Sequence, residues 1–455
     1  MYRHCRLAAL LAACVLLGAA PWASAATEVY CRSPMQCRQP DSMQMLLRPG
    51  GTEAILDANF GLVFQSPEGG WQYTCDDIFA GRLPYRTQIT GDGRLLVPAM
   101  DGLHLSSDGC AWNKAGGALA GQSVYDVGFD RRPRTPGSPE RLWAVGGEPR
   151  MAALSTDGGM TFVAKQMFPE ALRMFRVVVA PSNPLVIYVS GFRKNVPLVM
   201  AVSTDGGDTW AIDDNASLDI AKPTQIVDFL GVSPDEPHTV YLMVTNATGD
   251  EIWKSTDKGK APVKVLTLAD QQQFAGGGFA FGANGQTVYV AGYEPLETPD
   301  RSPASLYVSH DAGQSWERRA SPSTGPRYRC VAYRDGTLYA CAGDQFSGDA
   351  FLVGTSTDEG KTWTPLIKLT DVRGPRGCKE LGDRCAGTLG FLQSFQDAGA
   401  PPARDAGASL PEPPPPMPKP RGCACANAPA PGGGSALALA LIALVAARRR
   451  RGPRA

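Results

Sequence analysis

Aspartate carboxylates recur along this chain in one fixed local setting. Four segments follow the pattern Ser-x-Asp-x-Gly-x-Ser/Thr-aromatic without a gap. Their defining residues are Ser155, Asp157, Gly159 and Phe162; Ser203, Asp205, Gly207 and Trp210; Ser309, Asp311, Gly313 and Trp316; and Ser356, Asp358, Gly360 and Trp363. A carboxylate in such a turn accepts hydrogen bonds from nearby backbone N–H groups, and the glycine adopts the positive φ that a turn requires. The pattern therefore predicts tight hydrogen-bonded turns.

Three further segments keep part of this pattern. Ser255, Asp257 and Gly259 are present in one that lacks the aromatic residue, and the segments beginning at Ser106 and Ser66 diverge more. The seven starting serines are 40 to 54 residues apart, and short β-branched runs such as residues 185–191 precede the motifs. A period near 50 with short strands is typical of propeller blades. We expect an all-β propeller of seven four-stranded blades, with six or eight as alternatives.

The repeated motif resembles the Asp-box, or BNR repeat, of sialidases and other propellers, and the resemblance covers residues 43–369. It implies that each motif forms the hairpin between the third and fourth strands of a blade, at the blade periphery. It also implies that the terminal aromatic residue packs between strands. The motif residues are accordingly predicted to be structural.

The resemblance to sialidases raises a catalytic alternative. Sialidases carry an Arg-Ile-Pro element, two further arginines, an Asp acid/base and a Tyr nucleophile assisted by Glu. Arg-Ile-Pro does not occur here, and residues 83–86 have the wrong order. Residues 327–329 are interpreted as a solvated loop that leads into the Cys330 strand; an Arg/Tyr cluster that lines the mouth of the propeller is the alternative. We expect a non-catalytic binding or scaffold module for a protein or glycan; a sialidase-type glycoside hydrolase is the alternative.

Two charged loops are candidates for a ligand surface. Glu148 and Arg150 follow one predicted strand, and Arg193 and Lys194 follow another at a comparable position; ordinary surface charge is the competing interpretation. Residues 26–395 hold 34 basic and 41 acidic residues, which disfavours nucleic acid as a partner. Histidines are few and scattered, so no metal, cofactor or catalytic residue is assigned.

The cysteines are expected to form disulfides. Ten remain after residue 25, an even number that is typical of an exported protein. A hairpin about Asp335 and Gly336 places Cys330 opposite Cys341. The other candidate pairs are Cys378 with Cys385, Cys31 with Cys37, and Cys75 with Cys110, a connectivity that the sequence leaves open.

The first 25 residues have the features of a signal peptide. Arg3 and Arg6 precede the apolar residues 7–20, and residues 23–25 form an A-x-A cleavage site. A lipoprotein box at residues 11–14 is the alternative. Residues 26–395 are assigned to the propeller, and the Pro/Ala-rich residues 396–422 to a linker.

Residues 423–455 combine Cys423 and Cys425, an apolar run at 436–447 that is predicted to be a short hydrophobic helix, and arginines at 448–451. This arrangement resembles the MYXO-CTERM sorting signal of myxobacterial surface proteins. The resemblance implies a sorting protease that removes the tail, and retention at the cell surface or outer membrane. A plain transmembrane anchor is the alternative, although 12 residues span only about 18 Å of a core about 30 Å thick.

Overall fold

The computed structural model describes residues 40–66, 69–83, 86–132, 140–213, 226–246, 249–268, 273–293, 304–320, 326–343, 350–378 and 381–397. The predicted signal peptide, Cys31 and Cys37, the linker, Cys423 and Cys425, and the apolar tail lie outside these residues. The chain divides into two units, Met1–Ala403 and Arg404–Ala455, and all described residues belong to the first.

The strands follow one another in short antiparallel meanders. They are β1 (Ser42–Leu47), β2 (Ala54–Ala58), β3 (Gly61–Gln65) and β4 (Trp71–Cys75); β5 (Gln88–Ile89), β6 (Leu95–Ala99), β7 (Gly102–Ser106) and β8 (Asn113–Lys114); β9 (Gly116–Gly117); β10 (Val124–Phe129), β11 (Leu142–Gly146), β12 (Met151–Ser155) and β13 (Thr161–Met167); β14 (Arg173–Val179), β15 (Ile187–Arg193), β16 (Val196–Ser203) and β17 (Ala211–Asp213); β18 (Ile226–Val232), β19 (Val240–Asn246), β20 (Gly249–Ser255) and β21 (Val263–Thr267); β22 (Gln273–Phe281), β23 (Val288–Tyr293), β24 (Ser305–Ser309) and β25 (Glu317–Ala320); β26 (Cys330–Arg334), β27 (Thr337–Cys341), β28 (Val353–Ser356) and β29 (Thr364–Ile367); and β30 (Val372–Pro375).

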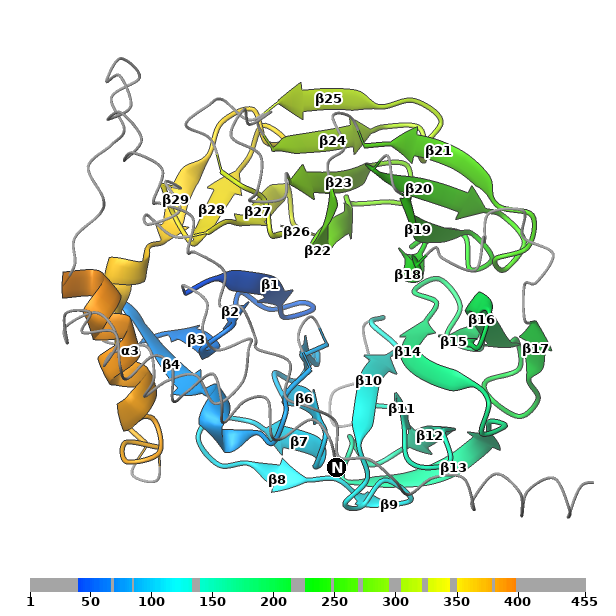
Figure 1. The fold of residues 1–455 in the computed structure, drawn as a ribbon, viewed down its shortest axis with the longest axis horizontal. Coiled ribbons are helices and arrows are strands. Elements are labelled where there is room, and N and C mark those ends of the chain that lie inside the picture. The colour runs from blue at the N-terminus through cyan, green and yellow to red at the C-terminus, as the bar shows by residue number, and fades with distance from the viewer. Residues whose placement is uncertain are drawn as a thin grey trace, which may run out of the picture. The chain divides into compact units, whose positions relative to one another are not determined.

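These strands form an all-β propeller whose sheets surround a common axis (Figure 1). Five separate blade sheets of four or five strands contain β1–β4 with β30, β5–β8, β10–β13 with β9, β14–β17, and β18–β21. Strands β22 to β29 form one sheet of eight. The structure thus has five separate blade sheets among the described residues, and not the seven separate blades that the sequence predicts.

The eight-stranded sheet results from a close approach of two inner strands. Gly277 of β22 pairs in parallel with Cys330 of β26, and its N–H donates a 3.2 Å hydrogen bond to the Arg329 carbonyl. A Cβ atom on Gly277 would lie 2.7 Å from the Cβ of Cys330. Glycine therefore allows the two backbones to bond and joins the meander β22–β25 to the meander β26–β29.

The hydrophobic core lies between consecutive sheets. One cluster joins Leu103 of β7 to Ala144 of β11, and the next joins Trp143 of β11 to Val199 of β16. Strand β11 is buried along its whole length because both of its faces are covered by neighbouring sheets. This explains why central strands have continuous apolar sequences instead of an alternating pattern.

The C-terminal end of the described chain closes the ring. Strand β30 pairs in parallel with β4 of the first sheet, and β1 contacts β26 and β27 of the last meander. Two disulfides, Cys75–Cys385 and Cys110–Cys378, join the same C-terminal segment to the first and second sheets. The Cα–Cα distances are 5.5 and 5.7 Å.

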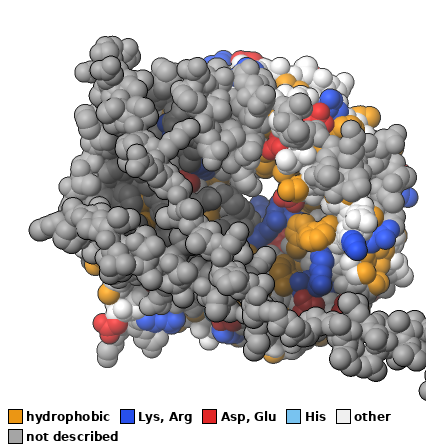
Figure 2. Space-filling view, in the orientation of Figure 1, with side chains coloured by type: hydrophobic (Ala, Val, Ile, Leu, Met, Phe, Trp, Pro, Cys, Tyr) orange, Lys and Arg blue, Asp and Glu red, His pale blue; other side chains and the backbone are white. Residues whose placement is uncertain are grey.

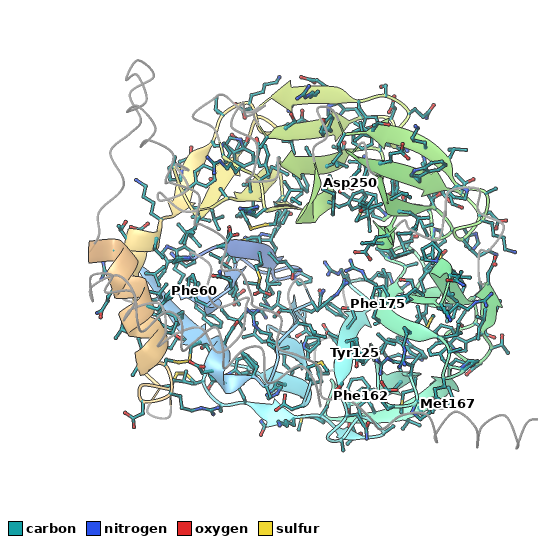
Figure 3. The ribbon with its side chains drawn as sticks, viewed as in Figure 1. Phe60, Tyr125, Phe162, Met167, Phe175 and Asp250 are labelled. Atoms are coloured by element: carbon teal, nitrogen blue, oxygen red, sulfur yellow. A yellow bond between two sulfur atoms is a disulfide. The ribbon has the colours of Figure 1, made fainter. Side chains whose placement is uncertain are left out.

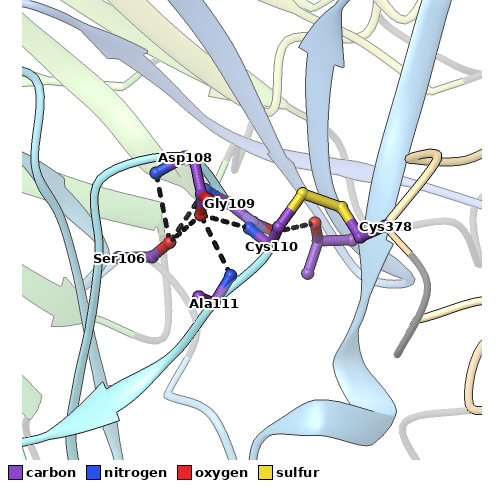
Figure 4. Close-up of a disulfide and its surroundings, with 7 residues drawn as sticks. Ser106, Asp108, Gly109, Cys110, Ala111 and Cys378 are labelled. Atoms are coloured by element: carbon purple, nitrogen blue, oxygen red, sulfur yellow. Dashed lines mark hydrogen bonds between the residues drawn. A yellow bond between two sulfur atoms is a disulfide. The ribbon is translucent and has the colours of Figure 1, made fainter.

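The disulfide predictions are partly correct. Cys330 pairs with Cys341 across the β26–β27 hairpin, as the sequence predicts. The pairs Cys378–Cys385 and Cys75–Cys110 are wrong, because local spacing cannot show that the C-terminal segment folds back onto the first two sheets. Figure 4 shows Cys110–Cys378 beside Ser106 and Asp108.

Among the described residues, an α-helix follows the last strand of the region assigned to the propeller. Helix α3 (Ala386–Asp397) follows Cys385, and two short 3-10 helices occupy Asp76–Ile78 (η1) and Leu369–Asp371 (η4). The sequence does not predict α3, because its two glycines and its threonine have low helix propensity. Tertiary contacts hold it: Leu392 is buried, and the Gln396 amide donates to the carbonyls of Leu369 and Val372. Within the described residues, no helix is long and apolar enough to cross a membrane.

Candidate functional site

The repeated motifs form closed hydrogen-bonded turns between the third and fourth strands of their meanders. In the segment from Ser203, the hydroxyl of that serine donates to Asp205 at 2.8 Å and accepts from the Gly207 N–H at 2.8 Å. The same carboxylate accepts the Thr209 N–H at 3.0 Å and the Thr209 hydroxyl. The segments from Ser155, Ser309 and Ser356 repeat these bonds. The motif carboxylates are therefore occupied within their own turns.

The ionisation of these carboxylates agrees with that structural role. Hydrogen bonds from the Ser315 hydroxyl and N–H and from Ser309 lower the pKa of Asp311 to about 2. The corresponding bonds also lower the pKa values of Asp205 and Asp358. A group ionised so far below neutral pH cannot serve as a general acid.

The motif glycines also join neighbouring sheets. Gly207 has φ of 93°, and a Cβ atom there would lie 2.1 Å from the Trp143 ring of the preceding sheet. Gly259 lies against Met200 and Gly360 against Leu306, in each case a residue of the preceding meander. Each turn is thus held against the blade before it, and a functional site has to be sought elsewhere.

Three of the inner strands, which lie nearest the axis of the propeller, contain register shifts. The register shifts between Ser42 and Gln44 in β1, between Val124 and Asp126 in β10, and between Met174 and Arg176 in β14. The residues at these shifts are Met43, Tyr125 and Phe175. A bulge redirects the side chains that follow it, and bulges are frequent next to functional sites.

The side chains that follow the shifts line a central cavity. Its volume is about 540 Å³, and its wall includes Gln44, Asp126, Arg176 and Asp228 from β1, β10, β14 and β18. The positive charge of Arg86 acts on both aspartates and opposes the rise in their pKa values that burial causes. We call Arg86, Asp126, Arg176 and Asp228 the channel cluster.

The carboxylates of the channel cluster are buried and bonded to backbone. Asp126 accepts the N–H groups of Val127 and Val177, both at 3.0 Å, and Asp228 accepts the Phe229 N–H at 2.8 Å. Burial raises the pKa of Asp126 to about 6 in spite of the opposing charge of Arg86. Burial likewise raises the pKa of Asp228. These are the conditions under which a carboxyl group can hold a proton near neutral pH.

A second group of side chains lies where β10 and β14 begin. The Arg150 guanidinium carbon lies 4.0 Å from the centroid of the Tyr125 ring. Arg150 donates to the Gly147 carbonyl at 2.7 Å and to the Glu148 carboxylate, which lies 3.8 Å from Arg173. The rings of Phe175 and Phe192 are 5.8 Å apart, and Phe192 is 46% exposed. We call Tyr125, Glu148, Arg150, Arg173, Phe175 and Phe192 the rim cluster.

The figures show how this cluster lies. Tyr125 and Phe175 come from neighbouring inner strands, whereas Met167 lies farther out on β13 (Figure 3). Hydrophobic side chains gather beside Lys and Arg side chains on this part of the face (Figure 2). Aromatic residues and arginine are the types enriched at binding surfaces.

The two charged loops of the sequence analysis meet this cluster. Glu148 and Arg150 belong to it, and Arg193 follows Phe192, which pairs with Arg173 in the sheet register. Lys194 lies in the β15–β16 turn. The solvated-loop interpretation of residues 327–329 is wrong, because Tyr328 is buried and Arg329 lies 3.3 Å from Asp41.

Several site residues were not singled out from the sequence. Asp126, Arg176 and Asp228 each interrupt an apolar inner strand, and that interruption was the available signal. Tyr125, Phe175 and Phe192 gave none, because aromatic residues in strands usually pack in a core. Among the described residues no cluster of His, Cys, Asp and Glu has the arrangement of a metal site.

Among comparisons with known proteins, only the search of solved structures finds matches. No protein-family model matches the chain, and no curated protein matches it significantly. The GH74 enzyme of Niastella koreensis shares 16% identity, covering 71% of this chain and 65% of its own, with a TM-score of 0.38. YCF48 from Cyanidioschyzon merolae shares 14%, covering 63% and 85%, with a TM-score of 0.41.

The β-propeller domain of the Trilobed protease from Pyrococcus furiosus shares 10% identity, covering 72% of this chain and 97% of its own, with a TM-score of 0.44. The chain spans 65% of the length of the Niastella enzyme and 37% of that of an ancestral GH74 enzyme. At these identities the likeness concerns the propeller fold alone.

Proposed function

We propose that this protein is an exported propeller that binds a protein or glycan partner without chemical turnover, through the rim cluster. The observation that carries the proposal is the exposed Phe192 beside Phe175, with the ion pairs and ring contact of Arg150 and Arg173 next to it. The ring contact and hydrogen bonds of Arg150 hold that side chain in place, so it loses little entropy when a partner binds. The three disulfides found among the described residues fit an exported protein.

The proposed architecture has seven blades of the Asp-box type. The eight-stranded sheet then counts as two blades, because a single parallel bridge joins its two four-stranded meanders. The turn from Ser106 lies between β7 and β8, the third and fourth strands of its meander. In the Ser106 turn, the Asp108 carboxylate accepts the N–H groups of Cys110 and Ala111 at 2.8 and 3.0 Å.

Mutation of the rim cluster tests the proposed function. Arg173→Glu and Phe192→Ser are expected to abolish capture of partners from a glycan array and from an outer-membrane protein extract. Arg141→Glu and Val263→Ser are matched controls, because Arg141 is exposed and Val263 is 61% exposed, both outside the rim cluster. If partners are still captured after both rim changes, the rim cluster is not the binding surface. Capture on the glycan array would identify a glycan partner, and capture from the extract a protein partner.

The catalytic alternative rests on the channel cluster. Asp126, with a pKa of about 6, and Asp228 lie in one cavity, and glycoside hydrolases use two carboxylates of different pKa. A panel of fluorogenic glycosides tests this alternative. Turnover that is lost in Asp126→Asn and Asp228→Asn would replace the binding function by hydrolysis of the sialidase type or a related one.

Surface retention through the C-terminal tail is a separate part of the proposal. Cys423 and Cys425 precede the short apolar run, and the arginines at 448–451 follow it. Mature protein from the native cell is expected to end near these cysteines. Intact-mass analysis decides the matter, since a surface-exposed chain that still ends at Ala455 would restore the plain transmembrane anchor.

A further inference from the structure

The rim cluster belongs to a longer surface formed by three corresponding turns. The β6–β7, β11–β12 and β15–β16 turns each join the second and third strands of a meander, so they lie at the same end of three sheets. Met100 of the first turn is 48% exposed. Glu148 and Arg150 belong to the second turn, and Phe192 lies just before the third. Met100 therefore extends the surface beyond the rim cluster.

Hydrogen bonds connect the first two of these turns. The Ser123 hydroxyl donates to the Met100 carbonyl at 2.8 Å, and the Ser123 carbonyl accepts the Gly147 N–H at 2.9 Å. Arg150 donates to the Gly147 carbonyl at 2.7 Å. The three sheets are consecutive neighbours, since core clusters join β7 to β11 and β11 to β16. Met100 and Phe192 are thus exposed apolar residues on the two outer turns, with Arg150 on the turn between them.

This surface is more basic than the propeller as a whole. Residues 26–395 hold 34 basic and 41 acidic residues. The three turns, β8 and the loop 168–173 hold five basic and three acidic residues, namely Lys114, Arg150, Arg173, Arg193, Lys194, Asp101, Glu148 and Glu170. Asp101 already accepts from Lys114 at 2.6 Å, and Glu148 accepts from Arg150. The Arg173 side chain is half exposed. Such a surface favours a partner that supplies carboxylates.

The aromatic side chains favour a protein over a neutral glycan. A sugar ring stacks on an open aromatic face, whereas the Arg150 guanidinium covers one face of the Tyr125 ring at 4.0 Å from its centroid. The rings of Phe175 and Phe192 pack against each other at an angle of 56°. A ligand rich in hydroxyl groups also needs acceptors, and the Glu148 carboxylate is already bonded to Arg150.

We propose that the partner is an extended acidic protein segment with apolar side chains on both sides of its carboxylates. Arg173 donates to the carboxylates, and Met100 and Phe192 contact the apolar side chains. Apolar anchors beside arginine are typical of the residues that dominate binding energy. This inference rests on the proposed function, whose surface it uses, and it adds the class of partner and the contribution of Met100.

Fluorescence anisotropy with labelled decapeptides tests the class of partner on the purified full chain with its disulfides intact. The acidic probe has alternating aspartates and glutamates between two terminal leucines, and ten extended residues reach about 33 Å. One control peptide has Asn and Gln in place of the acids, and the other has Ser in place of the leucines. The acidic probe is expected to bind with a dissociation constant of about 0.1 mM or below, and each control peptide at least about tenfold more weakly.

Variants of exposed residues locate the bound peptide. Arg173→Gln and Met100→Ser are each expected to weaken the acidic probe at least about fivefold at an unchanged melting temperature. Arg141→Gln and Val263→Ser are the matched controls and leave its affinity unchanged, because both residues are exposed elsewhere. Raising NaCl from about 50 to about 500 mM is expected to weaken the acidic probe as well.

The inference is overturned if the folded protein does not bind the acidic probe up to about 1 mM, or if either control peptide binds equally well. Unchanged affinity in Arg173→Gln and Met100→Ser overturns it too. Tighter binding of an oligomannuronate of equal charge would make the partner an acidic glycan instead.

The capture experiment distinguishes this inference from the proposed function. If Arg173→Glu and Phe192→Ser abolish capture but the acidic probe does not bind, the rim cluster is a binding surface for a different class of partner. If capture persists in both variants, the proposed function fails at this surface.

Discussion

The backbone N–H of Val177 donates a 3.0 Å hydrogen bond to the carboxylate of Asp126, and this bond joins the inner strands of two neighbouring sheets. The same carboxylate accepts the N–H of Val127 at 3.0 Å. Asp126 is 4% exposed, so both bonds are made away from solvent. One buried side chain therefore contributes both to the cohesion of the ring and to the charge of the cavity.

Asp126 should give the stability of the protein a distinct pH dependence. Its pKa of about 6 in the folded protein lies above the ordinary value of 3.8, so the folded state binds more protons than the unfolded state between these pH values. Stability from this group is therefore greatest below pH 4 and falls as the pH rises through about 6. The effect is of order 1–3 kcal/mol.

The pH dependence can be isolated with Asp126→Asn. The amide oxygen retains one acceptor, but the side chain no longer titrates. Urea denaturation between pH 4 and 7 should show less decline with pH for the variant than for the unchanged protein. The same decline in both proteins would exclude Asp126 as its source.

The complete and incomplete motifs offer a matched test of the turn. Asp205→Ala removes the acceptor of the Thr209 N–H and hydroxyl, whereas Asp257 has alanine at the corresponding position 261 and no hydroxyl to accept. Asp205→Ala should therefore lower the melting temperature more than Asp257→Ala does. Partner binding at the rim should persist in both variants. Equal effects on melting would mean that the threonine bonds contribute nothing.

Ser203 should be more sensitive, because its hydroxyl is buried between Asp205 and the Gly207 N–H. Ser203→Ala leaves that N–H without its acceptor, and the expected cost is about 1–2 kcal/mol of unfolding free energy. Urea denaturation provides the measurement. An unchanged denaturation midpoint would show that the serine bonds are not needed to hold the turn.

The sequence predicted the propeller fold and the motif turns, although not the number of separate blade sheets, because the turns depend on local chemistry. The turn from Ser203 closes on itself within seven residues, 203–209, and the Cys330–Cys341 pair lies across a single hairpin. From residue 372 onward, the chain folds back onto the first sheets. This return forms the Cys75–Cys385 and Cys110–Cys378 disulfides and positions β30 and α3. Their partners lie about 300 residues away, and no local pattern encodes that distance.

The candidate site was harder to predict for a related reason. Asp126 and Arg176 occur within apolar strands, and only the ring brings them to the same cavity. Nothing in the sequence shows that Arg150, a loop residue, contacts Tyr125 of an inner strand. Such sites depend on long-range packing. In a single sequence, the only sign of it is a charged residue that interrupts an apolar strand.

Gly207 provides a test of the contact between neighbouring sheets. Gly207→Ala meets a positive φ and a Cβ position 2.1 Å from the Trp143 ring, so the expected loss is about 3 kcal/mol or more. Gly121→Ala is the control: its φ is also positive, at 67°, but no atom lies within 4 Å of the added Cβ. Its expected loss is about 1 kcal/mol. Equal losses, compared by urea denaturation, would assign the whole effect to the backbone and none to the contact.

The disulfides that close the ring should act as a pair. Removing Cys75–Cys385 alone leaves Cys110–Cys378, which closes almost the same long loop, so the unfolded chain gains little additional freedom. Removing both releases a loop of about 300 residues. The serine variant of all four cysteines should therefore lose more than twice the stability lost on removing either bond alone.

Cys330–Cys341 is the natural comparison, since its separation is only 11 residues. Chain entropy assigns such a short loop about 3 kcal/mol, less than a loop of 100 residues or more. Under non-oxidising, chelated conditions, the denaturation midpoint should fall least on removing either ring-closing bond alone, more on removing Cys330–Cys341, and most on removing both ring-closing bonds. If loss of both ring-closing bonds costs no more than loss of one, the parallel pairing of β30 with β4 is sufficient to close the ring without them.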